Sequence, residues 1–288
     1  GHKLGGETVL FRHDKTFVSR SLFAVSVGAG MDEAALDAKL AEIQKVDYER
    51  IGEREYVEFV FVRDEGQGAE KLVSAVRKAA AIGRGVIVDT KDPEAVKAVL
   101  EAGKDLIING ADASNWEQMN AAVQGKALLG VGGGSLLDIY DTVEKLEKAG
   151  NKNLVIDVTA ASIKETFASA VLARRSAIKD NVRTLGYPSL VDLTKLAGGD
   201  IHLQTALAAL FTMKYGSILV MENMSYAESL PLHGLRQNIY TDPQKPMKVE
   251  PGIYPINGAG PDDPCLLTVD FALTYFLVSG EIERSKVP

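Results

Sequence analysis

Short, continuous apolar runs alternate with amphipathic stretches from about residue 21 to residue 240. Continuous rather than alternating hydrophobicity is typical of strands that are covered on both faces, as in a parallel sheet. The sequence therefore predicts eight buried parallel strands, which are expected at residues 22–28, 57–62, 86–89, 106–109, 127–132, 154–158, 189–193 and 217–223.

The segments between these runs carry apolar residues at helical spacing. In the segment 92–103, Asp92 suits the N-cap of a helix, Pro93 suits its first position, and Gly103 can end it. The segment 69–83 has a similar apolar stripe and also ends with glycine. Each predicted strand is therefore expected to lead into a helix.

Eight strand–helix units within about 220 residues match the size of a (β/α)8 TIM barrel. An open, doubly wound α/β sheet is the alternative. We favour the barrel, because eight evenly spaced units without a large insertion close more naturally than they spread. The seventh strand is the least secure of the eight, since Pro188 precedes it.

The composition changes sharply after the predicted barrel. The segment 241–264 holds six of the ten prolines of the chain, which predicts an extended linker arm. The apolar run Leu266–Val269 and the aromatic-rich pattern after it predict one strand and one helix, which cannot bury their own apolar faces. The expected organisation is an N-terminal extension at 1–20, a TIM barrel at 21–240, the arm at 241–264, and the first strand–helix unit of a truncated α/β domain at 265–288.

Charge and composition narrow the function classes. A net charge of −7 and a pI near 5.3 argue against a nucleic-acid partner, which would need a surplus of basic residues on one face. No segment approaches the roughly 20 apolar residues of a membrane span, and the polar N-terminus does not read as a signal peptide. A cytoplasmic location is expected. The one cysteine, Cys265, excludes an internal disulfide or an all-cysteine metal site within this chain.

Among the polar residues near the carboxyl ends of the predicted strands, three stand out as candidates for a binding site. They are Asp89, Asn109 and Asp157, and TIM barrels work at the carboxyl ends of their strands. Two carboxylates and an amide could hold a flat heterocycle, because aspartate accepts from ring N–H groups and asparagine both donates and accepts. The alternative is that these side chains cap the helices and loops that follow the strands.

Other motifs carry weaker signals. The stretch GVGGGS at 130–135 could cradle a phosphate, which would suit an enzyme acting on a phosphorylated metabolite, or it could be a tight turn with Ser135 as N-cap. His202 and His233 fit helix-surface or packing positions and show no metal-ligand spacing. No nucleophile motif is present. The sequence therefore predicts no catalytic residue and no metal site of its own.

Two longer stretches resemble a known family. They lie on either side of the predicted barrel and arm: GGETVLFRHDKTF at 5–17 and FALTYFLVSGEIERSKVP at 271–288. Both are similar to the large (gamma) subunit of the corrinoid iron–sulfur protein of acetyl-CoA synthase and decarbonylase/synthase complexes. The resemblance implies a TIM barrel between an N-terminal segment that binds a [4Fe–4S] cluster and a C-terminal domain that binds a corrinoid (cobalamin). The cluster-binding cysteines are absent from this sequence, so the cluster is expected only in a missing N-terminal segment.

The resemblance also implies a function. Such a protein carries a methyl group from a methyltetrahydrofolate or methanopterin methyltransferase to acetyl-CoA synthase in the reductive acetyl-CoA (Wood–Ljungdahl) pathway, and it pairs with a small subunit. Thr268, Asp270 and Thr274 fall in the stretch that would face the corrinoid, although the corrinoid is expected to be absent from this fragment alone. An alternative is a pterin-binding methyltetrahydrofolate methyltransferase barrel, in which Asp89, Asn109 and Asp157 would hold the pterin.

Overall fold

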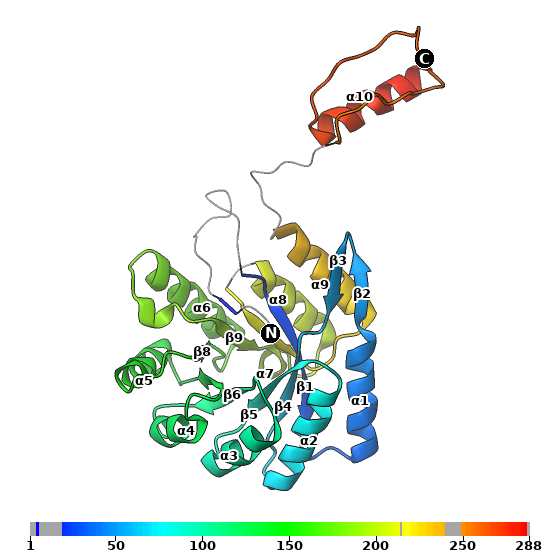
Figure 1. Cartoon of the computed structure of the whole chain (residues 1–288). Helices are drawn as coiled ribbons and strands as arrows, with labels where there is room; N and C mark the ends of the chain where they lie inside the picture. The colour runs from blue at the N-terminus through cyan, green and yellow to red at the C-terminus, as the bar shows by residue number, and fades with distance from the viewer. Residues whose placement is uncertain (1–3, 6–18, 214, 240–248, 287–288) are drawn as a thin grey trace. The chain divides into compact units, whose positions relative to one another are not determined.

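The chain forms a closed barrel of eight parallel strands in the computed structural model, which describes residues 4–5, 19–213, 215–239 and 249–286. The order around the barrel is β1-β10-β9-β8-β7-β6-β5-β4, so the predicted TIM barrel is confirmed and the open sheet is excluded (Figure 1). Each of the eight predicted runs overlaps one barrel strand, including the run after Pro188. The strands are β1 (Leu22–Gly28), β4 (Phe59–Arg63), β5 (Gly85–Asp89), β6 (Ile107–Ala111), β7 (Leu128–Val131), β8 (Leu154–Asp157), β9 (Ser189–Asp192) and β10 (Ile218–Met221).

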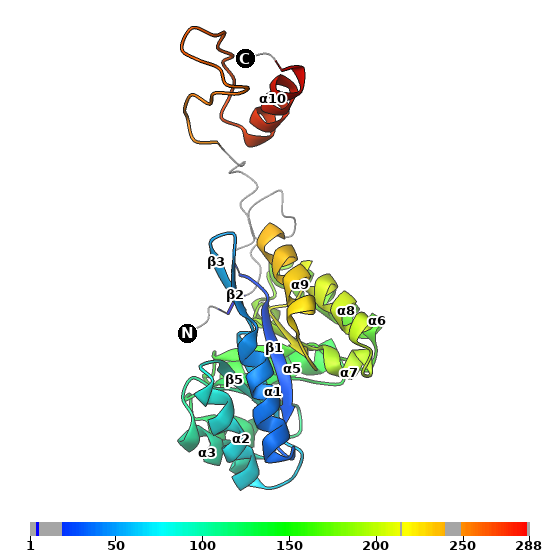
Figure 2. The ribbon, with the colours of Figure 1, turned by 90° about the vertical axis from the view of Figure 1, so that its right-hand side faces the viewer.

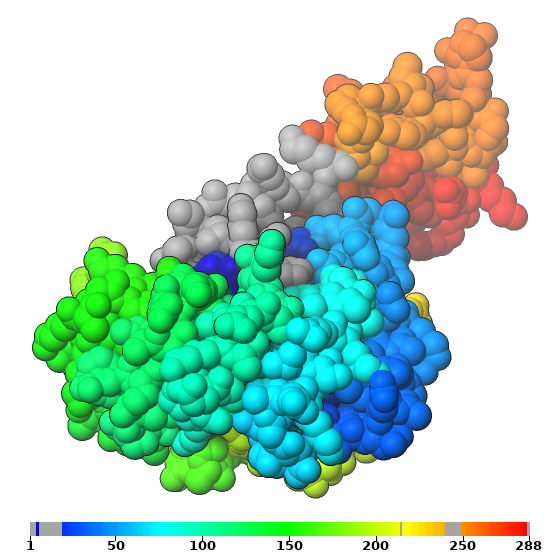
Figure 3. Space-filling model, turned by 60° about the horizontal axis from the view of Figure 1, so that its bottom comes forward, coloured from blue at the N-terminus to red at the C-terminus, as the bar shows by residue number. Residues whose placement is uncertain are grey.

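Helices surround the barrel and cover its outer face (Figure 1). They begin where the sequence supplies caps: Asp92 accepts a hydrogen bond from the amide of Glu94, and Pro93 opens the helix. The space-filling view shows neighbouring helices side by side, from α1 in blue to α5 in green (Figure 3). The helices are α1 (Glu33–Lys45), α2 (Ala69–Ala81), α3 (Pro93–Ala102), α4 (Trp116–Val123), α5 (Leu136–Lys148), α6 (Ile163–Ile178), α7 (Leu193–Ala197), α8 (Ile201–Met213) and α9 (Tyr226–Ile239), with a short 3₁₀ turn at Arg183–Leu185.

Each barrel strand points alternate side chains into two separate cores. One core lies between the sheet and the helices, where Val60, Val88 and Ile108 pack. The other fills the barrel interior and includes Phe61 and Ile87. This alternation leaves the last inward position of each strand at the carboxyl-terminal mouth of the barrel, and it is what places the polar side chains described below.

A β-hairpin that the sequence analysis did not predict follows α1. Its strands are β2 (Asp47–Arg50) and β3 (Glu53–Tyr56), and the turn places Ile51 and Gly52 at φ of 50° and 71°. Positive φ at both turn residues is the geometry of a two-residue hairpin turn. The hairpin projects beyond the barrel strands (Figure 2) and is fastened to α9 by a hydrogen bond between Tyr48 and His233 of 2.8 Å.

The described residues after 248 form a second unit with one helix, α10 (Ala272–Ser285). The predicted helix is therefore present, but the predicted strand at Leu266–Val269 is wrong, because residues 264–270 are irregular. A strand needs a neighbour for its amides and carbonyls, and the described part of this unit contains no strand for it to pair with.

Part of the predicted arm packs within this second unit. The ring of Tyr254 lies 5.1 Å from that of Tyr275 on α10, and the side-chain amide of Asn257 donates to the carbonyl of Ile282 at 2.9 Å. The described residues 249–264 are therefore in contact with the helix that they precede. The proposed limits of the arm and of the terminal unit stay predictions.

Candidate functional site

The mouth of the barrel gathers the last inward side chains of neighbouring strands. The register pairs Arg63 with Asp89, Asp89 with Asn109, and Asn109 with Gly130, so these positions lie level across β4 to β7. Asp157 ends β8 on the other side of β7. At this level of the barrel, polar side chains take the place of the apolar residues that fill the rest of its interior.

Asn109 joins the two carboxylates that the sequence analysis singled out. Its side-chain amide nitrogen donates to Oδ1 of Asp89 at 2.8 Å and to Oδ2 of Asp157 at 3.1 Å. The structure therefore brings Asp89, Asn109 and Asp157 together, as expected from their places at the ends of strands. Because one NH2 group serves both carboxylates, the orientation of the amide is fixed by its partners.

The oxygen of the Asn109 side-chain amide has no partner among the described residues. This atom, Oδ1, is buried. It lies beside Gly130, where a Cβ would come within 2.4 Å of Oδ1 and 3.0 Å of the Asn109 Cα. Glycine at position 130 therefore gives the Asn109 side chain its room.

Asp157 is shielded from solvent at the base of this group. Burial raises the pKa of its carboxyl, while hydrogen bonds from Thr159 and Asn109 act in the opposite direction. The amide of Thr159 donates to Oδ1 at 3.0 Å. The carboxyl of Asp157 is thus hydrogen-bonded at both oxygens but holds its proton more readily than an exposed aspartate.

Arg63 is the first of two basic mouth residues that the sequence analysis missed. Its Nη2 donates to both carboxylate oxygens of Asp192 at 2.9 Å, and its Nη1 lies 3.4 Å from Oδ2 of Asp89. Its Nε donates to the hydroxyl of Ser26 at 2.9 Å, and the guanidinium carbon lies 4.8 Å from the centroid of the Phe61 ring. The guanidinium therefore spans the mouth from β1 to β9.

Lys195 adds a second positive charge above the same carboxylates. Its Nζ lies 3.4 Å from Oδ2 of Asp192, whose side chain is fully buried. Partial burial opposes the charge of Lys195, but the carboxylates of Asp192, Asp157 and Asp89 outweigh that effect and raise its pKa. The mouth is thus a compact network of alternating charges.

An open cavity of about 520 Å³ borders this network at Asp89 and Lys195. Of the three predicted residues only Asp89 lines it. A small ligand would first meet carboxylates, a hydroxyl and two ammonium groups. The lining residues are Asp64, Gly66, Asp89, Thr90, Lys91, Asp92 and Lys195.

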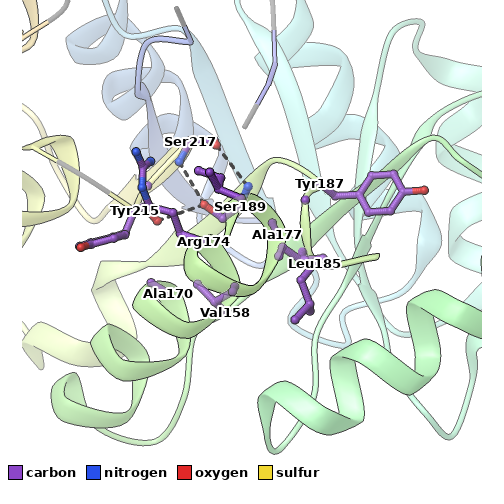
Figure 4. A pocket seen from close by; sticks show the side chains of 14 residues that line it. Val158, Ala170, Arg174, Ala177, Leu185, Tyr187, Ser189, Tyr215 and Ser217 are labelled. Atoms are coloured by element: carbon purple, nitrogen blue, oxygen red, sulfur yellow. Dashed lines mark hydrogen bonds between the residues drawn. The ribbon is translucent and has the colours of Figure 1, made fainter. Parts of the chain in front are cut away.

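A second, smaller cavity of about 60 Å³ lies between α6 and the residues at the start of β9 and β10 (Figure 4). Ser189 and Ser217 close one side of it, and each hydroxyl accepts a hydrogen bond of 3.2 Å from the backbone amide of the other residue. The guanidinium of Arg174 lies 5.7 Å from the ring of Tyr215 at its edge. The space suits one or two water molecules and carries no reactive pair.

The glycine-rich stretch at 130–135 forms a turn into α5. The hydroxyl of Ser135 caps the helix by accepting from the amide of Asp138 at 3.2 Å, so the predicted N-cap is confirmed. The Asp138 carboxylate accepts in return from that hydroxyl at 2.9 Å. A carboxylate therefore already lies at this helix start, which disfavours a phosphate there.

Among the described residues, the two histidines and the cysteine form no reactive group. His233 is buried in α9, where burial and the nearby Arg236 lower its pKa to about 3, while His202 is exposed. Cys265 is exposed in the second unit. No group of three His, Cys, Asp or Glu side chains suited to a metal ion occurs within the described ranges.

The candidate corrinoid-facing residues lie in the second unit. Thr268 and Asp270 are exposed in the irregular stretch before α10, and Thr274 is half-buried on the first turn of the helix. Large apolar side chains near them in the sequence are poorly covered: Leu267 is 94% exposed and Phe276 is 61% exposed. The exposed apolar residues of this unit include Leu266, Leu267, Val269, Phe271, Leu273, Phe276 and Leu277.

These features define a TIM-barrel protein whose mouth is lined with paired charges and which is joined to a second, incompletely covered unit. Solved structures share the barrel: dihydropteroate synthase from Thermus thermophilus has a TM-score of 0.57 at 18% identity, covering 77% of this chain and 95% of that one. Burkholderia cenocepacia dihydropteroate synthase complexed with 7,8-dihydropteroate has a TM-score of 0.56 at 15% identity, covering 77% and 92%. At this identity the likeness shows the fold alone.

The chain belongs to the family described as CO dehydrogenase/acetyl-CoA synthase delta subunit, which it matches over residues 2–288. It is 32% identical to the corrinoid/iron–sulfur protein large subunit of Moorella thermoacetica, over 99% of this chain and 64% of the relative. It is 31% identical to the acetyl-CoA decarbonylase/synthase complex subunit gamma of Methanosarcina acetivorans, again over 99% and 64%. The resemblance to the large (gamma) subunit is thereby confirmed, and the chain spans about 64% of the length of these relatives.

A membrane-spanning helix is not found in the part of the chain that the structure describes.

Proposed function

We propose that this chain is the barrel-bearing part of a corrinoid methyl carrier. The observation that carries the proposal is the match along 99% of the chain to proteins named as corrinoid/iron–sulfur large subunit and decarbonylase/synthase gamma subunit. In this role the protein takes a methyl group from a methyltetrahydrofolate or methanopterin methyltransferase and delivers it to acetyl-CoA synthase. The barrel is its scaffold.

The second unit has side chains that fit a corrinoid. Thr268 and Thr274 offer hydroxyls and Asp270 offers a carboxylate, which suit the amide groups at the edge of such a macrocycle. Exposed Leu267 and Phe276 offer apolar surface for its flat face. When bound, the corrinoid supplies the cobalt that carries the methyl group, and these residues bind and orient it.

The chain's residues do not fit a [4Fe–4S] cluster. Such a cluster is held by about four cysteine thiolates, and Cys265 is the one cysteine of the sequence. We therefore derive no step through a cluster in this chain. The segment that would bind it remains a prediction from the family resemblance.

The proposed partners are a small subunit, the methyltransferase and acetyl-CoA synthase, in the cytoplasm. The decisive experiment is size-exclusion chromatography of the natural protein with a purified small subunit of the same complex. We expect a stable one-to-one complex. Separate elution of the two proteins at micromolar concentration would contradict the proposal.

A pterin-binding methyltransferase is the second candidate, favoured by the meeting of Asp89, Asn109 and Asp157 at the barrel mouth. The barrel fold is also shared with an enzyme solved in complex with 7,8-dihydropteroate. Titration calorimetry with methyltetrahydrofolate tests this function directly. Binding that weakens on Asp157→Ala would support it, and the absence of heat at millimolar ligand would exclude it.

A further inference from the structure

The guanidinium of Arg63 makes the contacts that a bound ligand would make at the barrel mouth. It is planar, it lies 4.8 Å from the centroid of the Phe61 ring, and it donates to both oxygens of Asp192 at 2.9 Å. Its other terminal nitrogen lies 3.4 Å from Asp89. A flat group with several N–H donors, held between carboxylates above an aromatic ring, is thus already present.

The surrounding site is built from acceptors. Asp157 and Asp89 accept from the same Asn109 amide, and the Oδ1 of Asn109 is buried with no partner within the described residues. Thr194 also faces the guanidinium, with its hydroxyl oxygen 2.5 Å from Nη2. Such a site selects donors, and the guanidinium supplies five N–H groups in a fixed plane.

The charges at the mouth nearly balance when the two cations are counted. Arg63 and Lys195 face Asp89, Asp157 and Asp192, two of which are buried. Removing Arg63 would leave the fully buried carboxylate of Asp192 without its nearest cation, which is costly. An incoming N–H ligand must therefore displace a charge that the barrel itself provides.

We propose that the mouth of this barrel is a self-occupied site, in which the Arg63 guanidinium holds the position between Asp89 and Asp192 that a planar N–H ligand would otherwise take. Arg63 is then the residue that determines whether the barrel binds such a ligand. The ligand class includes guanidinium and amidinium ions and the 2-amino-4-oxopyrimidine ring of a pterin, which present adjacent N–H donors on one edge.

The inference is independent of the methyl-carrier proposal, and it opposes the second candidate function. It explains why Asp89, Asn109 and Asp157 can meet at a barrel mouth without forming a pterin site. The Arg63 guanidinium lies 3.4 Å from Asp89, the one residue of the three that lines the cavity.

The test compares the wild type with Arg63→Ala, and uses Arg54→Ala as the matched control. Arg54 pairs with Asp47 on the exposed hairpin, away from the mouth. The probes are 6-hydroxymethylpterin, followed by its own fluorescence, and methylguanidinium chloride, followed by thermal melting against potassium chloride at equal ionic strength. We expect Arg63→Ala to bind the pterin at least tenfold more tightly than either other protein, and to gain thermal stability saturably with methylguanidinium.

Two results would overturn the inference: pterin binding by the wild type as tight as that of Arg63→Ala, or a folded Arg63→Ala that responds to neither probe. Arg63→Gln, which keeps most of the stem without the charge, replaces the alanine variant should that variant fail to fold. Should neither variant fold, tight pterin binding by the wild type at micromolar concentration would still overturn the inference, and no such binding is expected.

Discussion

Replacing Arg236 with alanine should destabilise the barrel more than any exposed ion-pair substitution. Arg236 on α9 is 2% exposed, and its Nη1 donates to Oε1 of Glu58 at 2.8 Å and to the carbonyl of Ser21 at 2.9 Å. It also pairs with the fully buried Glu55 of the hairpin. Alanine would leave two buried carboxylates without their cation.

The expected loss follows from that arrangement. Breaking a buried ion pair by removing one partner typically costs about 3–5 kcal/mol. For a protein of this size each kcal/mol shifts Tm by roughly 2–4 °C, so the melting temperature should fall by roughly 6–20 °C. Burial also raises the pKa of Glu55, and without Arg236 that carboxyl should take up a proton more readily.

Urea unfolding followed by circular dichroism measures the loss, with Lys97→Ala as the control. Lys97 pairs with Glu94 on the surface of α3, and its side chain is 53% exposed. The control should change the free energy of unfolding by less than about 0.5 kcal/mol. An Arg236→Ala protein within about 1 kcal/mol of the wild type would refute the view that this cluster holds the hairpin and α9 onto the barrel.

Three further outcomes are expected. Because the pKa of Asp157 is raised, the folded state holds its proton more tightly than the unfolded state, so this contribution to stability is complete below about pH 4 and is lost as pH rises through the raised pKa. Asp157→Asn should therefore reduce the fall in the free energy of unfolding with rising pH. Equal pH slopes for the two proteins in urea unfolding would contradict this. Gly130→Ala should lower the free energy of unfolding by about 1–3 kcal/mol, because the new Cβ forces the Asn109 side chain aside. Gly280→Ala is the control, since a Cβ there meets nothing within 4 Å, and it should not lower the stability. Equal denaturation midpoints for the two variants would count against the close packing of Gly130 on Asn109. Leu267→Ser should leave the barrel's melting temperature unchanged but reduce self-association in sedimentation velocity, since this apolar side chain is 94% exposed. Unchanged self-association would show that Leu267 takes no part in it.

The barrel could be predicted because its signal is local. Each strand is a continuous apolar run, and a cap such as Asp92 followed by Pro93 marks where a helix begins. The meeting of Asp89 and Asn109 followed as well, because residues that end parallel strands share one mouth.

The rest depends on contacts between distant parts of the chain. Arg63 ends an apolar run and gives no local sign of its partner Asp192, which lies 129 residues away. The hairpin sequence is strongly charged and is fixed by Arg236, 181 residues beyond Glu55. The strand expected at Leu266–Val269 did not form, because an apolar run specifies a strand only where another strand can pair with it.

The visible absorption spectrum of the natural protein, purified without oxygen and without added cofactor, tests the central claim most directly. A methyl carrier of this family should show corrinoid absorption at about one corrinoid per chain, and the band should shift when a methyltransferase and its methyl donor are added. A colourless protein that stays colourless after incubation with cobalamin would contradict the proposal that this barrel serves a corrinoid.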